Sequence, residues 1–445
     1  MKFSFNKIII LVAVLGMFCW TSCNIDEIPN PNETVLEEIL EGATPSELQT
    51  VVTGIESLMG QEMGFYYDVT SIIGRDYWFF TGSDPRYTGE LLGRENSQLD
   101  NAGFYGTRPY FGRYRTVKNC NILLEAVANA APGLTDEDIR GYNGFAKTIQ
   151  AYELLLVLNL QYQNGIRLDV ADVDNLGPFV TYDEALTGIA DLLDEGAADL
   201  SNANFRFSLS SGFAGFDTPD SFRRFNRAVA ARVAIYQSKK DAARAALGES
   251  FMDMMSAKNT GPALYFSIAG GEASNPVFRP TGQADAIIAH PSFVAAVEGT
   301  TDARQDKIQL RTKEEDGMIV NDTLRLDGLQ GTYDVVVYKS LADNIPLIRN
   351  EELWLIGAEA NIGHDNAQAE LMLNLVRAEN NLDVYSGGTS DAELTDEMLH
   401  QRWLSLWGEG HRWADMRRYG RLDELPLDRA GDDVWEQMPR PVTEN

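Results

Sequence analysis

The segment Leu399–Gly420, LHQRWLSLWGEGHRWADMRRYG, constrains the fold more than any other part of the chain. Its apolar spacing predicts two short amphipathic helices joined by a Gly-Glu-Gly corner, with Trp403 and Trp407 one turn apart on the first helix. Trp413 faces inward from the second helix. The two glycines of the corner lack side chains and let two backbones approach closely. We therefore expect this corner to dock against another part of the fold.

Opposite charges flank the same corner. The acids Glu409 and Asp415 lie close in the sequence to three arginines, Arg412, Arg417 and Arg418. Two carboxylates can act as the acid and base of a glycosidase when they face one bond. Paired charges beside tryptophans more often form structural ion pairs, and we favour that role here.

Residues 408–420 resemble the EGHRWFDLRR signature that closes the C-terminal part of the SusD/RagB family of nutrient-uptake lipoproteins. Residues 349–360 and 369–382 are similar to two further helices of that family, in the same order. Residues 223–239 look like its tetratricopeptide-type hairpin, and residues 438–445 look like its closing run. The resemblance implies a mainly α fold, with a tetratricopeptide-like scaffold of helical hairpins, long irregular loops and a few short β-hairpins.

The resemblance also implies structural roles for a set of charged motif residues. These are Arg349, Glu352, Glu359, Glu409, His411, Arg412, Asp415 and Arg417. It further divides the chain into residues 44–248, an N-terminal SusD-like helical part; residues 249–347, an irregular excursion with short β-hairpins; and residues 348–445, a C-terminal SusD/RagB helical part.

Helix signals are clearest in the first of these parts. Thr44 and Thr181 each open a capping box, and Thr135 is placed to cap the long helix predicted over residues 136–162. In the excursion, β-prone runs appear instead, at residues 307–310, 318–326 and 333–338. These patterns predict packed helices before residue 249 and small hairpins after it.

The N-terminus has the features of an export signal. Lys7 precedes an apolar run, residues 8–18, that is too short to span a membrane. Thr21-Ser22-Cys23 resembles a bacterial lipobox, which makes residues 1–22 a lipoprotein signal peptide, Cys23 the lipidated residue and residues 23–43 an acylated tether. Acids just after Cys23 resemble surface-export signals of Bacteroidota lipoproteins and favour the outward face of the outer membrane. Plain secretion, with Cys23 as a bystander thiol, is the alternative.

The charge balance limits the partners of the mature chain. Removing Lys2 and Lys7 with the signal leaves 35 basic and 66 acidic residues, a net charge of −31. Nucleic acid and anionic lipid headgroups are therefore poor partners, and the membrane is reached through the lipid anchor only. Cys120 has no disulfide partner and sits in a helical pattern, so we expect a packed thiol. No zinc-spaced Cys/His cluster occurs, and we expect no metal and no cofactor.

The candidate ligand-binding region is residues 66–111, which is rich in aromatic residues, glycines and acids. Aromatic faces on loops suit stacking on sugar rings, and neighbouring acids and amides suit hydrogen bonding to hydroxyls. The alternative is that most of these rings are buried under the loops. The rings we select as ligand contacts are Trp78, Phe79, Tyr87, Tyr105 and Tyr110.

The expected function is a surface-exposed outer-membrane lipoprotein that binds a nutrient, with a glycan favoured over a peptide. By the resemblance, it delivers that nutrient to a SusC-like TonB-dependent transporter, and its helical side packs on this partner. No nucleophile elbow, phosphate-binding loop or HExxH motif occurs, so we expect no catalytic residues. A surface glycoside hydrolase and a helical scaffold that binds only proteins remain as alternatives.

Overall fold

The structure is a computed structural model that describes residues 36–95, 97–130, 132–172 and 174–444. Cys23 and the predicted signal peptide lie outside the described residues. The tether prediction, residues 23–43, is wrong at its end, because Leu36–Gly42 forms helix α2. Helix α2 contacts α5, so this part of the chain already belongs to the folded body.

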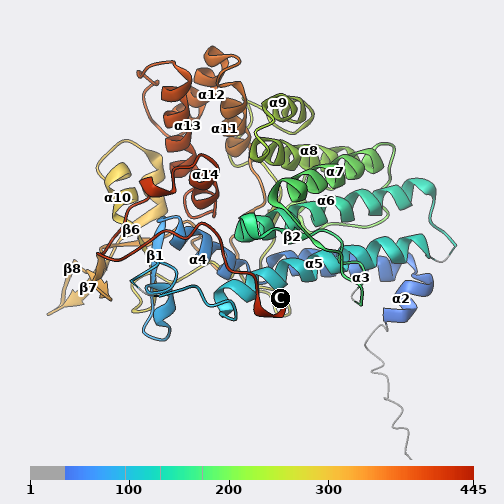
Figure 1. Cartoon of the computed structure of the whole chain (residues 1–445), viewed down its shortest axis with the longest axis horizontal. Helices are drawn as coiled ribbons and strands as arrows, with labels where there is room; N and C mark the ends of the chain where they lie inside the picture. The colour runs from blue at the N-terminus through green and yellow to red at the C-terminus, as the bar shows by residue number, and fades with distance from the viewer. Residues whose placement is uncertain (1–35, 96, 131, 173, 445) are drawn as a thin grey trace, which may run out of the picture.

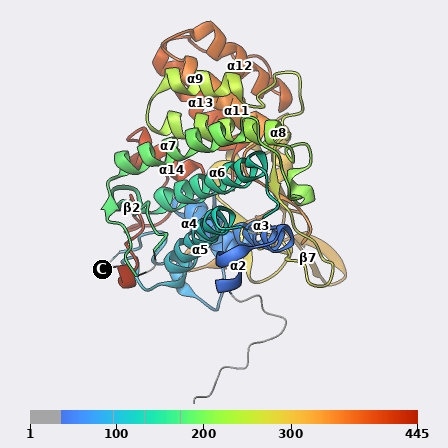
Figure 2. The ribbon, with the colours of Figure 1, turned by 90° about the vertical axis from the view of Figure 1, so that its right-hand side faces the viewer.

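Helical hairpins stacked side by side make up most of the molecule (Figures 1 and 2). Helix α5 packs on α6, α6 on α7, α7 on α8, and the stack continues through α9, α11 and α12. This arrangement confirms the predicted mainly α fold. The helices of the stack are α3 (Pro45–Gly60), α5 (Phe104–Ala128), α6 (Asp136–Gln161), α7 (Tyr182–Leu200), α8 (Pro219–Tyr236), α9 (Lys240–Glu249), α11 (Asn350–Asn361) and α12 (Asn366–Glu379).

The predicted helix starts are confirmed. Thr44 and Thr181 each accept a hydrogen bond from the backbone of a glutamate three residues on, and that glutamate bonds back to the cap. Thr135 begins α6 in the same way, with Asp138 as its partner. Such caps satisfy backbone N–H groups that the first helical turn leaves without partners.

A four-stranded antiparallel sheet joins segments that are far apart in the sequence. Its order is β1-β5-β11-β6, with β1 (Tyr77–Phe80), β5 (Ala286–Ala289), β11 (Tyr333–Val335) and β6 (Ile308–Leu310). Trp78 lies opposite Ile288, and Asp334 lies opposite both Ile288 and Gln309. The sheet therefore fixes the excursion against the loop that follows β1.

The remaining strands form two-stranded pairs. They are β2 (Ile166–Arg167) with β3 (Phe179–Val180), β4 (Ala263–Leu264) with β12 (Ile345–Pro346), β7 (Thr312–Glu315) with β8 (Met318–Asn321), and β9 (Leu324–Leu326) with β10 (Leu329–Gly331). Helix α10 (Pro291–Val297) also lies in the excursion. The predicted β-prone runs thus match strands β6, β8, β9 and β11.

Two helices occupy the region predicted to be irregular. Helix α4 (Met63–Ile73) is almost wholly buried, and α5 begins at Phe104, within the aromatic-rich segment that was expected to form loops. Pro109 lies inside α5 and removes one helical hydrogen bond, which is why the sequence pattern indicates a loop there. Packing overrides this local cost, since a Cβ on Gly112 would lie only 3.1 Å from the Glu62 side chain.

The C-terminal corner docks as expected. It joins α13 (Asp391–Ser405) to α14 (Arg412–Arg418), and Trp407 and Trp413 are buried. Trp407 lies just beyond the end of α13 rather than on it, and its Nε1 donates to the Asp76 carbonyl over 3.1 Å. Gly410 has φ 77°, and a Cβ there would lie 2.7 Å from the Thr70 hydroxyl on α4. Only glycine therefore allows this contact.

Membrane-spanning character is absent from the part of the chain that the structure describes. None of the helices there combines the length and apolarity needed to cross a bilayer.

Candidate functional site

Buried ion pairs connect many of the predicted motif residues. Arg349 bonds Glu409 over 2.8 Å and also pairs with Glu351, while Arg232 on α8 bonds Glu352 on α11 over 2.7 Å. Burial alone would raise the pKa of the Glu352 carboxyl, but the Arg232 guanidinium lowers it to about 2. Fixed arginines thus hold the Glu351 and Glu352 carboxylates in their charged form.

A second set of pairs surrounds α14. Asp415 bonds both Arg402 and Arg418 over 2.9 Å, and Arg418 also bonds Glu359 over 2.8 Å. Burial would raise the pKa of Asp415, but Arg402 and Arg418 lower it to about 2. These contacts tie α14 to α11 and α13.

The other motif residues also make scaffold contacts. Arg417 donates to the carbonyls of Glu436 and Asn159 and lies over the Tyr162 ring at 4.2 Å. Arg412 lies 4.0 Å over the Trp403 ring. His411 lines a small inner cavity of about 20 Å³, with room for one or two water molecules.

Four of the five rings selected as ligand contacts are inaccessible. Trp78 is 3% exposed and Tyr87 6%, while Tyr105 and Tyr110 are fully buried. The Trp78 indole N–H donates to Asp428 over 2.9 Å, so its edge is also occupied. Phe79 alone is partly exposed, and it packs edge-on against Tyr87 at 4.6 Å. The prediction assumed accessible faces, whereas packing with neighbouring rings covers them.

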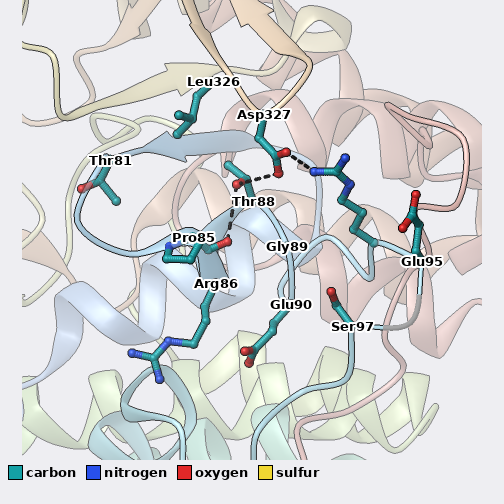
Figure 3. Close-up of a pocket in the computed structure, with 12 residues that line it drawn as sticks. Thr81, Pro85, Arg86, Thr88, Gly89, Glu90, Glu95, Ser97, Leu326 and Asp327 are labelled. Carbon is teal, nitrogen blue, oxygen red and sulfur yellow. Dashed lines mark hydrogen bonds and ion pairs between the residues drawn. The ribbon is translucent and has the colours of Figure 1, made fainter.

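A pocket of about 840 Å³ opens in the same region, between residues 81–97 and the tip of the β9–β10 hairpin (Figure 3). We call it the loop pocket. Hydroxyl groups come from Thr81, Thr88 and Ser97, and the glycines 82 and 89 leave room between them. Its charged lining residues are Arg86, Glu90, Arg94, Glu95 and Asp327.

Asp327 holds the two sides of the loop pocket together. It accepts a hydrogen bond from the Thr88 hydroxyl over 3.2 Å and pairs with Arg94 (Figure 3). From the C-terminal segment, Arg429 reaches the same carboxylate over 2.8 Å. One side chain on a hairpin tip thereby ties together three segments that are remote in sequence.

Asp327 was not among the predicted ligand-binding residues, although the sequence carries a signal for its position. Asp327 and Gly328 have φ values of 53° and 81° and connect β9 to β10 as a tight hairpin turn. An Asp-Gly pair between two apolar residues is a strong hairpin signal. The positions of Glu90 and Arg94 carried no comparable pattern.

Comparison with known protein families agrees with the motifs of the C-terminal part. Residues 323–441 match the family model described as the SusD family, and this span contains most of those motifs. This match assigns residues 323–441 to the SusD/RagB family. No curated protein matches it in sequence.

Solved structures share the fold of this chain at low sequence identity. A SusD superfamily protein from Bacteroides vulgatus ATCC 8482 has a TM-score of 0.67 and 13% identity, covering 90% of this chain and 96% of its own. Surface glycan-binding protein A from Bacteroides thetaiotaomicron has a TM-score of 0.66 and 13% identity, covering 91% and 97%. NanU from B. fragilis has a TM-score of 0.65 and 14% identity, covering 94% and 98%.

A second hollow of this protein, of about 660 Å³, lies between residues 303–307, residues 336–344 and the start of α11. Its polar floor is already satisfied internally. Lys307 donates to the Ser405 carbonyl over 2.6 Å, and Arg349 is saturated by carboxylates and a carbonyl. The loop pocket, with polar groups facing open space, is therefore the better candidate for ligand binding.

Proposed function

We propose that this protein is a surface receptor that binds a glycan in the loop pocket and delivers it to a SusC-like TonB-dependent transporter. The observation that carries the proposal is the open pocket of about 840 Å³, lined by hydroxyl and carboxylate groups and mounted on a SusD-family scaffold. Two structural neighbours are themselves described as surface glycan-binding proteins. The pocket is large enough for a short oligosaccharide.

The loop pocket is formed before any ligand arrives. Arg86 bonds Asp84 through two hydrogen bonds, of 2.9 and 2.7 Å, and lies over the Phe104 ring at 4.5 Å. Asp327 fixes the opposite side. A site whose side chains are already held loses little conformational entropy on binding, which favours affinity.

The proposal is binding without bond cleavage. The carboxylates first considered as a glycosidase pair, Glu409 and Asp415, are both ion-paired with arginines. A carboxyl held ionised by a fixed arginine is a poor proton donor to a leaving group. Release of reducing ends from a polysaccharide by the purified protein would favour the glycoside hydrolase alternative.

Binding can be tested by titrating the purified protein with neutral and acidic oligosaccharides in a calorimeter. Gly82 lines the pocket, and a Cβ added there would have nothing within 4 Å, so we expect Gly82→Trp to be tolerated and to obstruct the pocket. Gly270, in an exposed loop outside the pocket, has the same open space and provides the control Gly270→Trp. Heat with the wild type and the control, but not with Gly82→Trp, supports the proposal. Equal heat from all three would reject the loop pocket as the site.

Anchoring and partnership are separate parts of the proposal. We propose that Cys23 carries the lipid that holds the protein at the outer membrane, facing outward, and that the helical side packs on the transporter. Metabolic labelling with a fatty acid tests the anchor, with incorporation expected in the wild type and lost in Cys23→Ala. Co-purification with a TonB-dependent barrel from detergent extracts tests the partnership. Recovery of an unlabelled, unpartnered periplasmic protein would contradict both parts.

A further inference from the structure

The charges around the loop pocket bear on which glycans it can hold. Two arginines line it, Arg86 and Arg94, and on a first view they could bind an acidic sugar. Arg86, however, already donates two hydrogen bonds to Asp84, and its face is covered by Phe104. Because the guanidinium fork is occupied, little of its charge is offered to a ligand.

Arg94 is neutralised in the same way. It pairs with Asp327, whose carboxylate also binds Arg429, and Arg429 in turn pairs with Asp432 over 3.0 Å. The Arg94 guanidinium donates its hydrogen bond to Asp327 Oδ1. Both cations of the lining are therefore committed to the carboxylates that hold the pocket together.

Two lining carboxylates have no such compensation. Glu90 accepts a hydrogen bond from the Tyr105 hydroxyl and a longer one, 3.4 Å, from the Asp100 backbone. Glu95 is exposed at the rim of the pocket. Neither makes an ion pair within the part of the chain that the structure describes.

Counting charges gives the sign of the field in the pocket. The lining residues, their ion-pair partners and Asp432, which pairs with Arg429, comprise the cations Arg86, Arg94 and Arg429 and the carboxylates Asp84, Glu90, Glu95, Asp327 and Asp432, or three minus five, a net charge of −2. The chain as a whole has a net charge of −29. A carboxylate within the pocket would lie inside the Debye length of about 8–10 Å from Glu90 and Glu95, so it would be repelled.

We propose that the loop pocket selects uncharged glycans, and that Glu90 and Glu95 discriminate against acidic sugars such as uronates and sialic acids. This inference rests on the proposed function. Neutral sugar hydroxyls can donate hydrogen bonds to the two carboxylates without repulsion. A sugar carboxylate would lose water on entering the pocket and would find no free cation there to replace it. Glu90 and Glu95 thus act as specificity-determining residues rather than as the main source of affinity.

The test compares oligosaccharides that share a backbone but differ in charge. Suitable probes are mannohexaose with hexamannuronate, and lacto-N-tetraose with its sialylated form, titrated in about 50 mM salt. Where a pair of probes binds, we expect the neutral oligosaccharide to have a Kd at least about tenfold lower than that of the acidic one. Raising the salt to about 0.5 M should reduce this ratio of the two Kd values. In Glu90→Gln/Glu95→Gln the ratio should fall to within about threefold.

A matched variant controls for net charge. Glu314→Gln/Glu315→Gln removes two carboxylates from the exposed β7–β8 hairpin and should leave the ratio as in the wild type. If acidic oligosaccharides bind as tightly as neutral ones, and Gly82→Trp abolishes this binding, the proposed charge selection is wrong but the proposed function is supported. Absence of binding by every probe, or binding that Gly82→Trp does not affect, would overturn both.

Discussion

Arg232 on α8 and Glu352 on α11 form a buried pair with two hydrogen bonds of 2.7 Å, and both side chains are at most 4% exposed. Arg232 also donates to the Leu347 carbonyl over 2.9 Å. The pair therefore links the N-terminal helical part to the C-terminal family motif. Because both partners are buried, removing one of them tests how much the pair contributes to the stability of the fold.

Replacing one partner should destabilise the protein strongly. In Glu352→Gln the Arg232 charge remains buried without its counter-ion, and we expect a loss of about 3–5 kcal/mol in the free energy of unfolding. The exposed pair Arg140–Glu137 gives the control, since Glu137→Gln should cost less than about 1 kcal/mol. Urea unfolding measures both, and equal losses would contradict the assigned role of the buried pair.

The same pair predicts a pH dependence. Arg232 lowers the pKa of Glu352, against the opposing effect of burial, from 4.5 to about 2. A carboxyl with a lowered folded pKa adds stability above its unfolded pKa and loses it as the pH falls through the folded value. The stability gap between wild type and Glu352→Gln should therefore be full above about pH 5 and close towards pH 2. Urea unfolding at a series of pH values checks this, and a gap that widens in acid would disprove it.

Asp327→Asn should loosen the loop pocket with little effect on the rest of the fold. The change removes the charge that Arg94 and Arg429 share, so we expect glycan affinity to fall about tenfold or more, and amide exchange in residues 85–95 to become faster. Asp316 occupies the corresponding position of the Asp-Gly turn between β7 and β8, with φ 52°. Asp316→Asn is therefore the control and should change neither quantity.

Gly410→Ala separates backbone strain from steric clash. At φ 77°, alanine costs about 1–2 kcal/mol in any surroundings, and at Gly410 its Cβ would also meet the Thr70 hydroxyl at 2.7 Å. Gly420 has φ 66°, and a Cβ added there would have nothing within 4 Å. We expect Gly420→Ala to lower the unfolding free energy by the strain alone and Gly410→Ala by at least about 1 kcal/mol more. Thermal or urea unfolding that shows equal losses would argue against tight docking of the corner.

The scaffold was predictable because its signals are local. Capping boxes at Thr44 and Thr181, and apolar spacing between them, depend on residues a few positions apart. The pocket was harder to predict because its geometry depends on distant partners. Tyr105 belongs to a helix that its own proline and glycines disfavour, and its burial follows from packing rather than from pattern. Asp327 reaches the pocket only because the sheet brings the excursion to residues 85–95.

The order of pairing in that sheet has a consequence for biogenesis. Trp78 pairs with Ile288, more than two hundred positions along the chain, and Asp334 completes the ladder later still. Closing such a long loop is slow, because the conformational entropy that it costs is not compensated until the last strand pairs. Helical hairpins can form as soon as their own residues emerge, but the loop pocket must wait for residues far along the chain. A chain arrested before Tyr333 would lack both the completed sheet and helices α11 to α14, so ligand capture at the proposed site would itself report completed folding.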